Sequence, residues 1–353
     1  MQRARSLAAS VAVLALATQG CAAQPKRLAY SPDELRRDLA HRIPPGEVVV
    51  PFEITAEHVA RARELTQGTT DPAEKVRILV DAMFSRRVFG LRYLVGVPGT
   101  AEEAFRHGGG DCLALSSVFI GLARSVGLDA DYMDASFRVV ETEYLGDQTT
   151  VKVGHITAFV STPTGRLGLD FARMGRVDWY EPIDDVEAVA HFHNNLGYLL
   201  LEGGGEGGTP ADWEAASHQF ELATRVKPEF ARAWNNLGVA RARLGHRPEA
   251  RTAYRRAMEL DPLFSSPRLN LGAMLLDEGE AERALDVLET AARLDPKAPH
   301  VQYELGMARL KTGDRDGAVQ ALEKAVSLHG GWPAAQAVLD RLGAGGRTHR
   351  EDG

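Results

Sequence analysis

The stretch Gly108-Gly109-Gly110-Asp111-Cys112 runs from a glycine turn directly into an apolar helix, and it decides the fold of the first half of the chain. Apolar residues follow it at helical spacing: Leu115, Val118, Phe119, Leu122 and Val126. Gly127 then stands where a left-handed residue ends many helices. The pattern predicts a helix that packs one face on a core and holds Cys112 at a fixed N-terminus.

The segments around this helix predict a mixed domain. Asp71-Pro72 is typical of a helix start, with aspartate as the cap and proline in the first turn. Thr100 and Glu103 have the spacing of a capping box, which predicts a second helix from residue 101. Strands are expected at 42–52, 130–135, 156–160 and 167–171. Helices followed by antiparallel strands predict an α+β domain.

Cys112, His155 and Asp170 together carry the residue types of thiol chemistry. A thiolate is the reactive form of cysteine, and the N–H groups at a helix N-terminus stabilise it. A histidine takes the thiol proton, and a carboxylate holds the histidine ring in one orientation. Taken alone, Cys112 could be a buried residue that packs like a small apolar side chain, and His155 could be a structural histidine. The three residues together favour catalysis. Asp111 opposes thiolate formation unless its carboxylate turns away.

These residues resemble the transglutaminase-like superfamily, which has a papain-like core. The matching features are Gly110-x-Cys112, Ala123-Arg124-x-x-Gly127-Leu128, His155 before a strand and Asp170 in the next strand. The resemblance implies a cysteine nucleophile, a histidine base and an orienting aspartate. It also implies acyl transfer on amides, by hydrolysis, deamidation or crosslinking. The backbone N–H of Cys112 is one candidate oxyanion donor, and Tyr93 is the candidate for the second.

The second half of the chain repeats every 34 residues. Leu-Gly pairs mark the repeat: Leu237-Gly238, Leu271-Gly272 and Leu305-Gly306. Small residues at this spacing let two helices of a unit pack closely, and the pattern resembles the tetratricopeptide repeat. An earlier copy starts at Leu196-Gly197 and carries an insertion near 203–210, and 332–342 is expected to be a closing helix. About four repeats are predicted, forming an all-α solenoid.

An asparagine precedes the Leu-Gly pair in three repeats, as Asn195, Asn236 and Asn270. In tetratricopeptide proteins that hold extended peptides, an asparagine here resembles one that contacts the peptide backbone. The alternative is that Asn-Leu-Gly is common repeat sequence. Because repeats of this kind present a curved binding surface, we expect a protein or peptide partner.

The N-terminus has the features of an export signal. Arg3 and Arg5 precede an apolar run over 7–17, and Gly20-Cys21 follows. This resembles a bacterial lipoprotein signal in which Cys21 becomes lipidated; the alternative is cleavage after Ala22 or Ala23. We expect the protein in the periplasm, anchored to the outer membrane by lipid alone, because the apolar run is too short for a permanent span.

Composition excludes some classes of function. The formal charge is −7 and no basic stripe is present, so nucleic acid is not an expected partner. His191-x-His193 points its two rings apart on a helix, and no paired-ligand spacing surrounds Cys112. Neither a metal nor a cofactor is expected.

The sequence therefore predicts an α+β papain-like, transglutaminase-like domain followed by an all-α tetratricopeptide solenoid. The predicted divisions are a signal at 1–21, a tether and lead-in at 22–70, the α+β domain at 71–186, the repeats with their closing helix at 187–343 and a disordered tail at 344–353. The leading hypothesis is an exported peptidase or amidase acting on a protein or peptide that the repeats present. The alternative is a non-catalytic assembly lipoprotein with an inert α+β domain.

Overall fold

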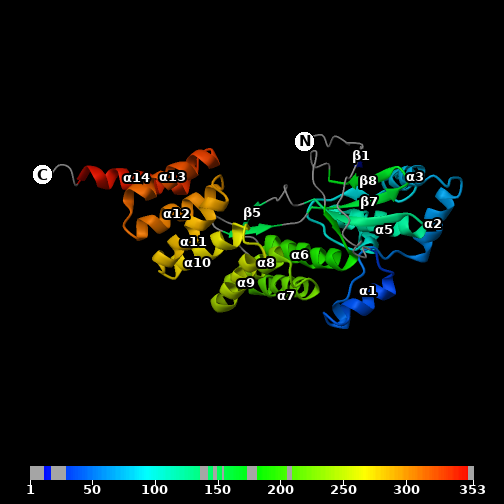
Figure 1. Ribbon diagram of the computed structural model, residues 1–353, viewed down its shortest axis with the longest axis horizontal. Coiled ribbons are helices and arrows are strands. Elements are labelled where there is room, and N and C mark those ends of the chain that lie inside the picture. The colour runs from blue at the N-terminus through cyan, green and yellow to red at the C-terminus, as the bar shows by residue number, and fades with distance from the viewer. Residues whose placement is uncertain are drawn as a thin grey trace. The chain divides into compact units, whose positions relative to one another are not determined.

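Figure 1 shows the computed structural model of the chain, which describes residues 12–16, 29–135, 142–145, 149–152, 155–172, 181–204 and 209–348. Cys21 lies outside the described residues. The contacts divide the chain into two compact units. The first contains Met1–Glu141, Val153–Leu199 and Glu221–Pro228, and the second contains Thr142–Lys152, Leu200–Phe220 and Glu229–Gly353.

Helices make up most of the first part of unit 1. They are α1 (Pro32–Leu39), α2 (Ala56–Thr66), α3 (Pro72–Phe84), α4 (Ala101–His107) and α5 (Cys112–Ser125), with a 3₁₀ turn at Pro45–Glu47. The Asp71 carboxylate accepts a hydrogen bond from the backbone N–H of Ala73, which caps α3. Thr100 and Glu103 form both hydrogen bonds of a capping box at the start of α4. Both predicted helix starts are therefore confirmed.

One five-stranded antiparallel sheet follows. Its strands are β1 (Ala12–Leu16), β4 (Asp129–Asp134), β7 (Ile156–Thr162), β8 (Gly165–Asp170) and β9 (Glu181–Ile183). Their order across the sheet is β1-β8-β7-β4-β9. Helix α5 lies along this sheet (Figure 1) and is buried from Cys112 to Ala123. The Ser116 hydroxyl donates to the carbonyl of Ile156, which ties α5 to β7 beside the predicted histidine.

Two small sheets complete the described strands. β2 (Arg92–Tyr93) pairs in parallel with β3 (Gly109–Gly110), directly before α5. β5 (Thr142–Leu145) and β6 (Thr149–Lys152) form an antiparallel pair in unit 2, where β6 lies against helices α8 (Ala231–Arg243) and α10 (Ser266–Asp277).

The lead-in contains two helices that were not predicted and lacks one strand that was. Residues 32–39 and 56–66, within the predicted tether and lead-in, form helices of unit 1. Ser31 caps α1 with a capping box, and Leu35 and Leu39 bury one face of it. The predicted strand at 42–52 is wrong, since the adjacent prolines Pro44 and Pro45 start a 3₁₀ turn there. Within the predicted signal, Ala12–Leu16 pairs with β8, whose open edge leaves backbone groups available.

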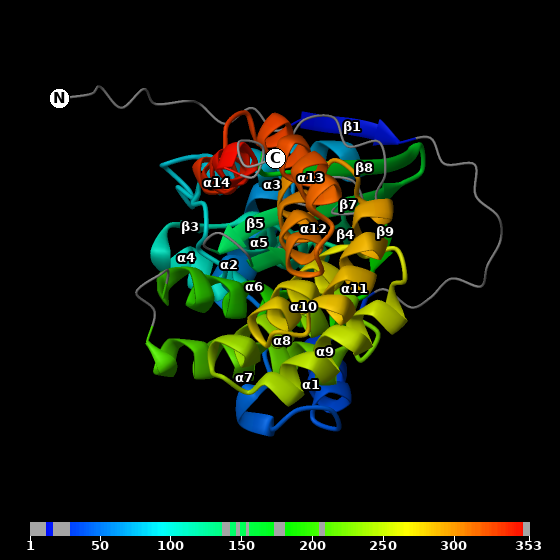
Figure 2. The same cartoon turned by 90° about the vertical axis from the view of Figure 1, so that its left-hand side faces the viewer.

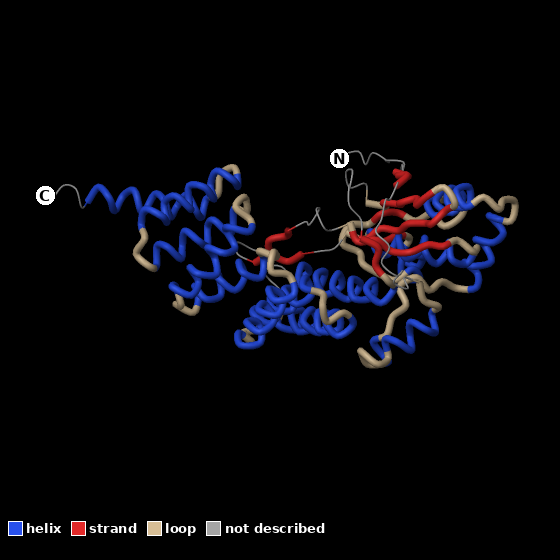
Figure 3. Tube along the Cα trace, viewed as in Figure 1, coloured by secondary structure: helices blue, strands red, loops and turns tan. Residues whose placement is uncertain are grey.

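From residue 185 the chain is a series of helices (Figure 3). In addition to α8 and α10, they are α6 (Asp185–Gly204), α7 (Pro210–Val226), α9 (Arg247–Leu260), α11 (Ala281–Leu294), α12 (Pro299–Lys311), α13 (Arg315–His329) and α14 (Pro333–Thr348). Helices α8 to α13 stack in sequence order (Figure 2). The helices from α8 to α14 confirm the predicted all-α second part.

The repeating glycines lie where paired helices touch. A Cβ on Gly272 of α10 would lie 2.4 Å from Cγ of Leu288 on α11, closer than real Cβ contacts allow. Gly238 faces Tyr254 and Gly306 faces Leu322 in the same way. The 34-residue spacing of the sequence therefore reflects one helix contact made three times.

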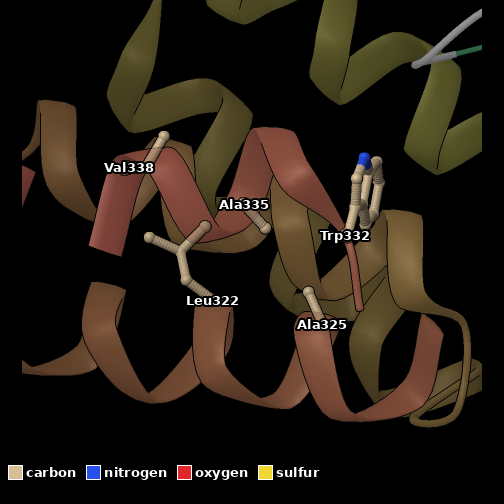
Figure 4. Close-up of a cluster of buried hydrophobic side chains, with 5 residues drawn as sticks. All are labelled: Leu322, Ala325, Trp332, Ala335 and Val338. Atoms are coloured by element: carbon tan, nitrogen blue, oxygen red, sulfur yellow. The ribbon is translucent and has the colours of Figure 1, made fainter. Parts of the chain in front are cut away.

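Helix α14 covers the end of the solenoid. Leu322 and Ala325 of α13 pack against Trp332, directly before α14, and against Ala335 and Val338 of α14 (Figure 4). The tail predicted from residue 344 begins too early, since α14 continues to Thr348. Within the described residues, no helix has both the length and the apolar character that a membrane span requires.

Candidate active site

A tightly paired glycine loop places Cys112 at the N-terminus of α5. The N–H of Arg92 donates to the carbonyl of Gly108, and the N–H of Leu94 donates to that of Gly110. Gly109 has φ +151°, and a Cβ there would lie 2.0 Å from the carbonyl oxygen of Arg92. Only glycine allows this approach. The glycine run thus fixes the direction in which α5 starts.

Asp111 caps the helix that carries Cys112. Its carboxylate accepts a hydrogen bond of 2.9 Å from the N–H of Ala114, so it turns toward the helix rather than into solvent. Burial raises the pKa of Asp111 from 3.8 to about 6, while hydrogen bonds from the Ala114 and Leu113 backbone and the charge of His155 oppose this rise. The negative charge noted in the sequence is therefore a helix cap.

His155 and Asp170 meet at one end of the sheet. Leu169 of β8 pairs with Ala158 of β7, so the start of β7 and the end of β8 lie side by side. His155 Nε2 lies 3.1 Å from Asp170 Oδ1, and both side chains are buried or nearly so. Asp170 Oδ1 also accepts the N–H of Ala172, which fixes the carboxylate. The carboxylate can therefore hold the imidazole in one orientation.

Cys112 is a second hydrogen-bond partner of the imidazole. Burial lowers the pKa of His155, but hydrogen bonds to Asp170 and to Cys112, together with the charges of both groups, raise it from 6.5 to about 10. The histidine is thus favoured as an imidazolium between Cys112 and a carboxylate. In this form His155 already holds the thiol proton and can give it to a leaving group.

Tyr93 lies on the strand beside the glycine loop. It pairs with Gly110 across β2 and β3, and 37% of its surface is exposed. Its role as an oxyanion donor stays a prediction. His107, the other histidine near the loop, is exposed at the end of α4.

Residues 59–160 match the profile of the transglutaminase-like superfamily, and residues 231–264 and 275–342 match profiles of the tetratricopeptide repeat. The chain joins a transglutaminase-like domain to tetratricopeptide repeats. The resemblance stated from the sequence is therefore confirmed for these two parts. No sequence among the curated proteins matches the chain.

Several solved structures resemble part of the chain. MamA from Desulfovibrio magneticus RS-1 is 23% identical over 46% of this chain and 88% of its own, with a TM-score of 0.40. PilF of Pseudomonas aeruginosa is 22% identical over 46% of this chain and 71% of its own, with a TM-score of 0.42. YrrB, titled a TPR protein with an unusual peptide-binding site, is 22% identical over 44% of this chain and 77% of its own, with a TM-score of 0.36. These likenesses concern the fold alone.

A buried ion-pair cluster in the transglutaminase-like domain escaped the sequence reasoning. Arg124, at the end of α5, makes two hydrogen bonds of 2.8 and 3.0 Å to Asp185 and one of 3.1 Å to Asp131. The backbone N–H of Tyr30 donates to the same Asp185 carboxylate. This cluster anchors the C-terminal end of α5. The only signal for it was Arg124 itself, within the motif that resembles the superfamily.

The asparagines of the repeats are buried between helices. The Asn270 amide donates to the Asn235 side chain at 3.0 Å, and Asn235 donates to Asn236 at 3.1 Å. Asn195 accepts from its neighbour Asn194 at 3.5 Å. These bonds link asparagines to one another; contact with a peptide stays a prediction.

Metal ligation finds no support among the residues that the structure describes. No group of three or more histidine, cysteine, aspartate or glutamate side chains gathers there closely enough to hold an ion. His191 and His193 are both buried on α6, and His191 Nε2 lies 3.7 Å from Asp134 Oδ2.

Proposed function

We propose that the transglutaminase-like domain is a thiol hydrolase that cleaves amide bonds, with Cys112 as nucleophile, His155 as acid and base, and Asp170 as the residue that orients His155. The observation that carries the proposal is the position of His155, which lies within hydrogen-bonding reach of Cys112 and 3.1 Å from Asp170. The three residues come from α5, the start of β7 and the end of β8. Their meeting supports acyl transfer.

The chemistry runs in two steps. The Cys112 thiolate attacks the amide carbonyl, and a carbon–sulfur bond forms. The His155 imidazolium then gives its proton to the amine as the carbon–nitrogen bond breaks, which leaves a thioester. A water molecule loses a proton to His155 as its oxygen attacks the thioester. The carbon–sulfur bond then breaks, which releases the carboxylic acid and restores the Cys112 thiolate beside the His155 imidazolium. The backbone N–H of Cys112 and Tyr93 are the proposed donors to the oxyanion.

We propose hydrolysis rather than crosslinking because water is abundant in the cell envelope and the sequence shows no amine acceptor site or calcium loop. Tetratricopeptide repeats generally mediate contacts between proteins. In this proposal they present the protein or peptide that the thiol domain cleaves.

The alternative function is a scaffold in which the transglutaminase-like domain is inert. Its support is burial, since Cys112 is 8% exposed and His155 7% exposed, and a substrate must reach both. In that case the repeats alone would carry the function.

Acyl-enzyme trapping separates the two functions. The full chain is incubated with amide and activated-ester acyl donors of varied side chain, quenched in acid and weighed intact by mass spectrometry. The hydrolase is expected to gain one acyl group on Cys112 and to turn over, and Cys112→Ala should gain none. His155→Ala should lose turnover, whereas His107→Ala, at an exposed histidine, should keep it. Equal acylation of the parent and His155→Ala would rule out the hydrolase.

We further propose that Cys21 is lipidated and that the protein is anchored in the outer membrane with the rest of the chain in the periplasm. The support is the Gly20-Cys21 pair behind a basic head and a short apolar run. Labelling of growing cells with an alkyne fatty acid should mark the parent and not Cys21→Ser. Equal labelling of both would rule out the anchor.

A further inference from the structure

Asp111 is a buried carboxylate next to the nucleophile, and the chemistry above does not use it. It is 8% exposed, and both its backbone and its side chain are held. Its N–H donates to the carbonyl of Val97 at 2.9 Å, and its carboxylate accepts the N–H of Ala114 at 2.9 Å. The backbone N–H of Leu113 is a second donor to the carboxylate. Asp111 therefore cannot turn away without breaking the start of α5.

These hydrogen bonds change what the helix offers to a thiolate. The first N–H groups of a helix have no partner inside the helix, and they carry the positive end of its dipole. In α5 the carboxylate of Asp111 accepts hydrogen bonds from the backbone N–H groups of Leu113 and Ala114. Of the N–H groups at the start of α5, a thiolate at Cys112 keeps only its own, and it also lies beside the negative charge of Asp111. Its main stabilising partner is then the imidazolium of His155.

We propose that Asp111 is a positioning residue, which fixes the start of the nucleophile helix and makes the Cys112 thiolate depend on His155 rather than on the helix N-terminus. The inference rests on the proposed function, in which Cys112 reacts as a thiolate. Its consequence is selectivity: the thiol becomes reactive only when His155 and Asp170 are in place.

A cycle of variants tests this directly. Asp111→Asn keeps an acceptor for the helix and removes the charge, and Asp111→Ala removes both. All proteins carry Cys21→Ser, so that Cys112 is the only thiol. The rate of alkylation by iodoacetamide is measured from pH 5 to 10 in the parent, in both variants, and in each combined with His155→Ala. Asp129→Asn, at an exposed aspartate of β4, is the charge-matched control.

The proposal predicts that Asp111→Asn moves the midpoint of the alkylation profile to lower pH by about one unit, the effect of one nearby charge, and that Asp129→Asn does not. Loss of His155 should raise the midpoint further in the parent than in Asp111→Ala, because freed N–H groups then stabilise the thiolate. Asp111→Ala should unfold at a lower temperature than Asp111→Asn, because it lacks the cap.

The proposal is overturned if the alkylation profiles of the parent and Asp111→Asn are identical. It is also overturned if His155→Ala shifts the alkylation midpoint equally with and without Asp111, which would leave Asp111 as a helix cap alone. Alkylation reports on the thiol itself, without a substrate. If the protein cleaves no amide, the proposed function is contradicted. The alkylation differences between these variants still decide the role of Asp111.

Discussion

Removing the charge of Asp170 should lower the pKa of His155. The imidazole Nε2 and the carboxylate Oδ1 are 3.1 Å apart, and their side chains are 7% and 12% exposed. A nearby opposite charge shifts a pKa by roughly 1–3 units, so Asp170→Asn should bring the His155 value of about 10 down by about 2 units. At 1.36 kcal/mol per unit, the change is worth about 3 kcal/mol.

Stability should change with pH in a defined direction. The pKa of folded His155 is about 10, above the ordinary 6.5, so its protonated form stabilises the fold. This contribution is complete below pH 6.5 and is lost as pH rises toward 10. The difference in unfolding free energy between the parent and Asp170→Asn should therefore be widest near pH 6 and should close by pH 10.

The assay is an NMR titration of the histidine ring signals, with the His155 signal assigned by its loss in His155→Gln. Guanidinium unfolding at several pH values supplies the free energies. Asp129→Asn removes an exposed carboxylate of the same domain and should leave the His155 titration unchanged. A His155 signal that titrates alike in the parent and Asp170→Asn would refute the ion pair.

Three further predictions concern residues away from the thiol. Burial and the charge of Asp277 raise the pKa of the Glu304 carboxyl from 4.5 to about 8, against the opposing charge of Lys311. Glu304→Gln should therefore match the parent in stability below pH 4.5 and exceed it increasingly up to pH 8, as measured by denaturant unfolding; a constant difference would contradict this. Gly272→Ala should cost about 1–3 kcal/mol in the same assay despite the better helix propensity of alanine, because the added Cβ overlaps Leu288; a more stable variant would disprove the close approach. Arg124→Lys should lower the unfolding free energy by about 2 kcal/mol, because lysine cannot form the two parallel bonds to a carboxylate; an unchanged value would show that the cluster is dispensable.

The sequence predicted the features that depend on local patterns. The 34-residue period identified the repeats, because each glycine of the period makes the same contact with the helix that follows it. The start of α5 was predicted for a similar reason, since the glycine run is a local signal for a turn before a helix, whereas the cap at Asp111 was not predicted. The predicted meeting of Cys112, His155 and Asp170 agrees with the geometry, although their catalytic role stays a prediction.

Features that depend on contacts between distant segments escaped prediction. Arg124 and Asp185 are 61 positions apart, and no local sequence pattern near either residue predicts their contact. The helices at 32–39 and 56–66 were not predicted within the tether and lead-in, because its frequent prolines indicated short, broken segments. The strand expected at 42–52 failed because its valines follow two prolines, which favour a tight turn.

The most direct test of a working thiol site is the pH dependence of Cys112 alkylation in the Cys21→Ser background, for the parent, His155→Ala and His107→Ala. We expect the midpoint of the parent and of His107→Ala to lie below that of His155→Ala, which should approach the free-thiol value of about 8.5. A parent midpoint near 8.5 that His155→Ala leaves in place would contradict the hydrolase and favour the scaffold.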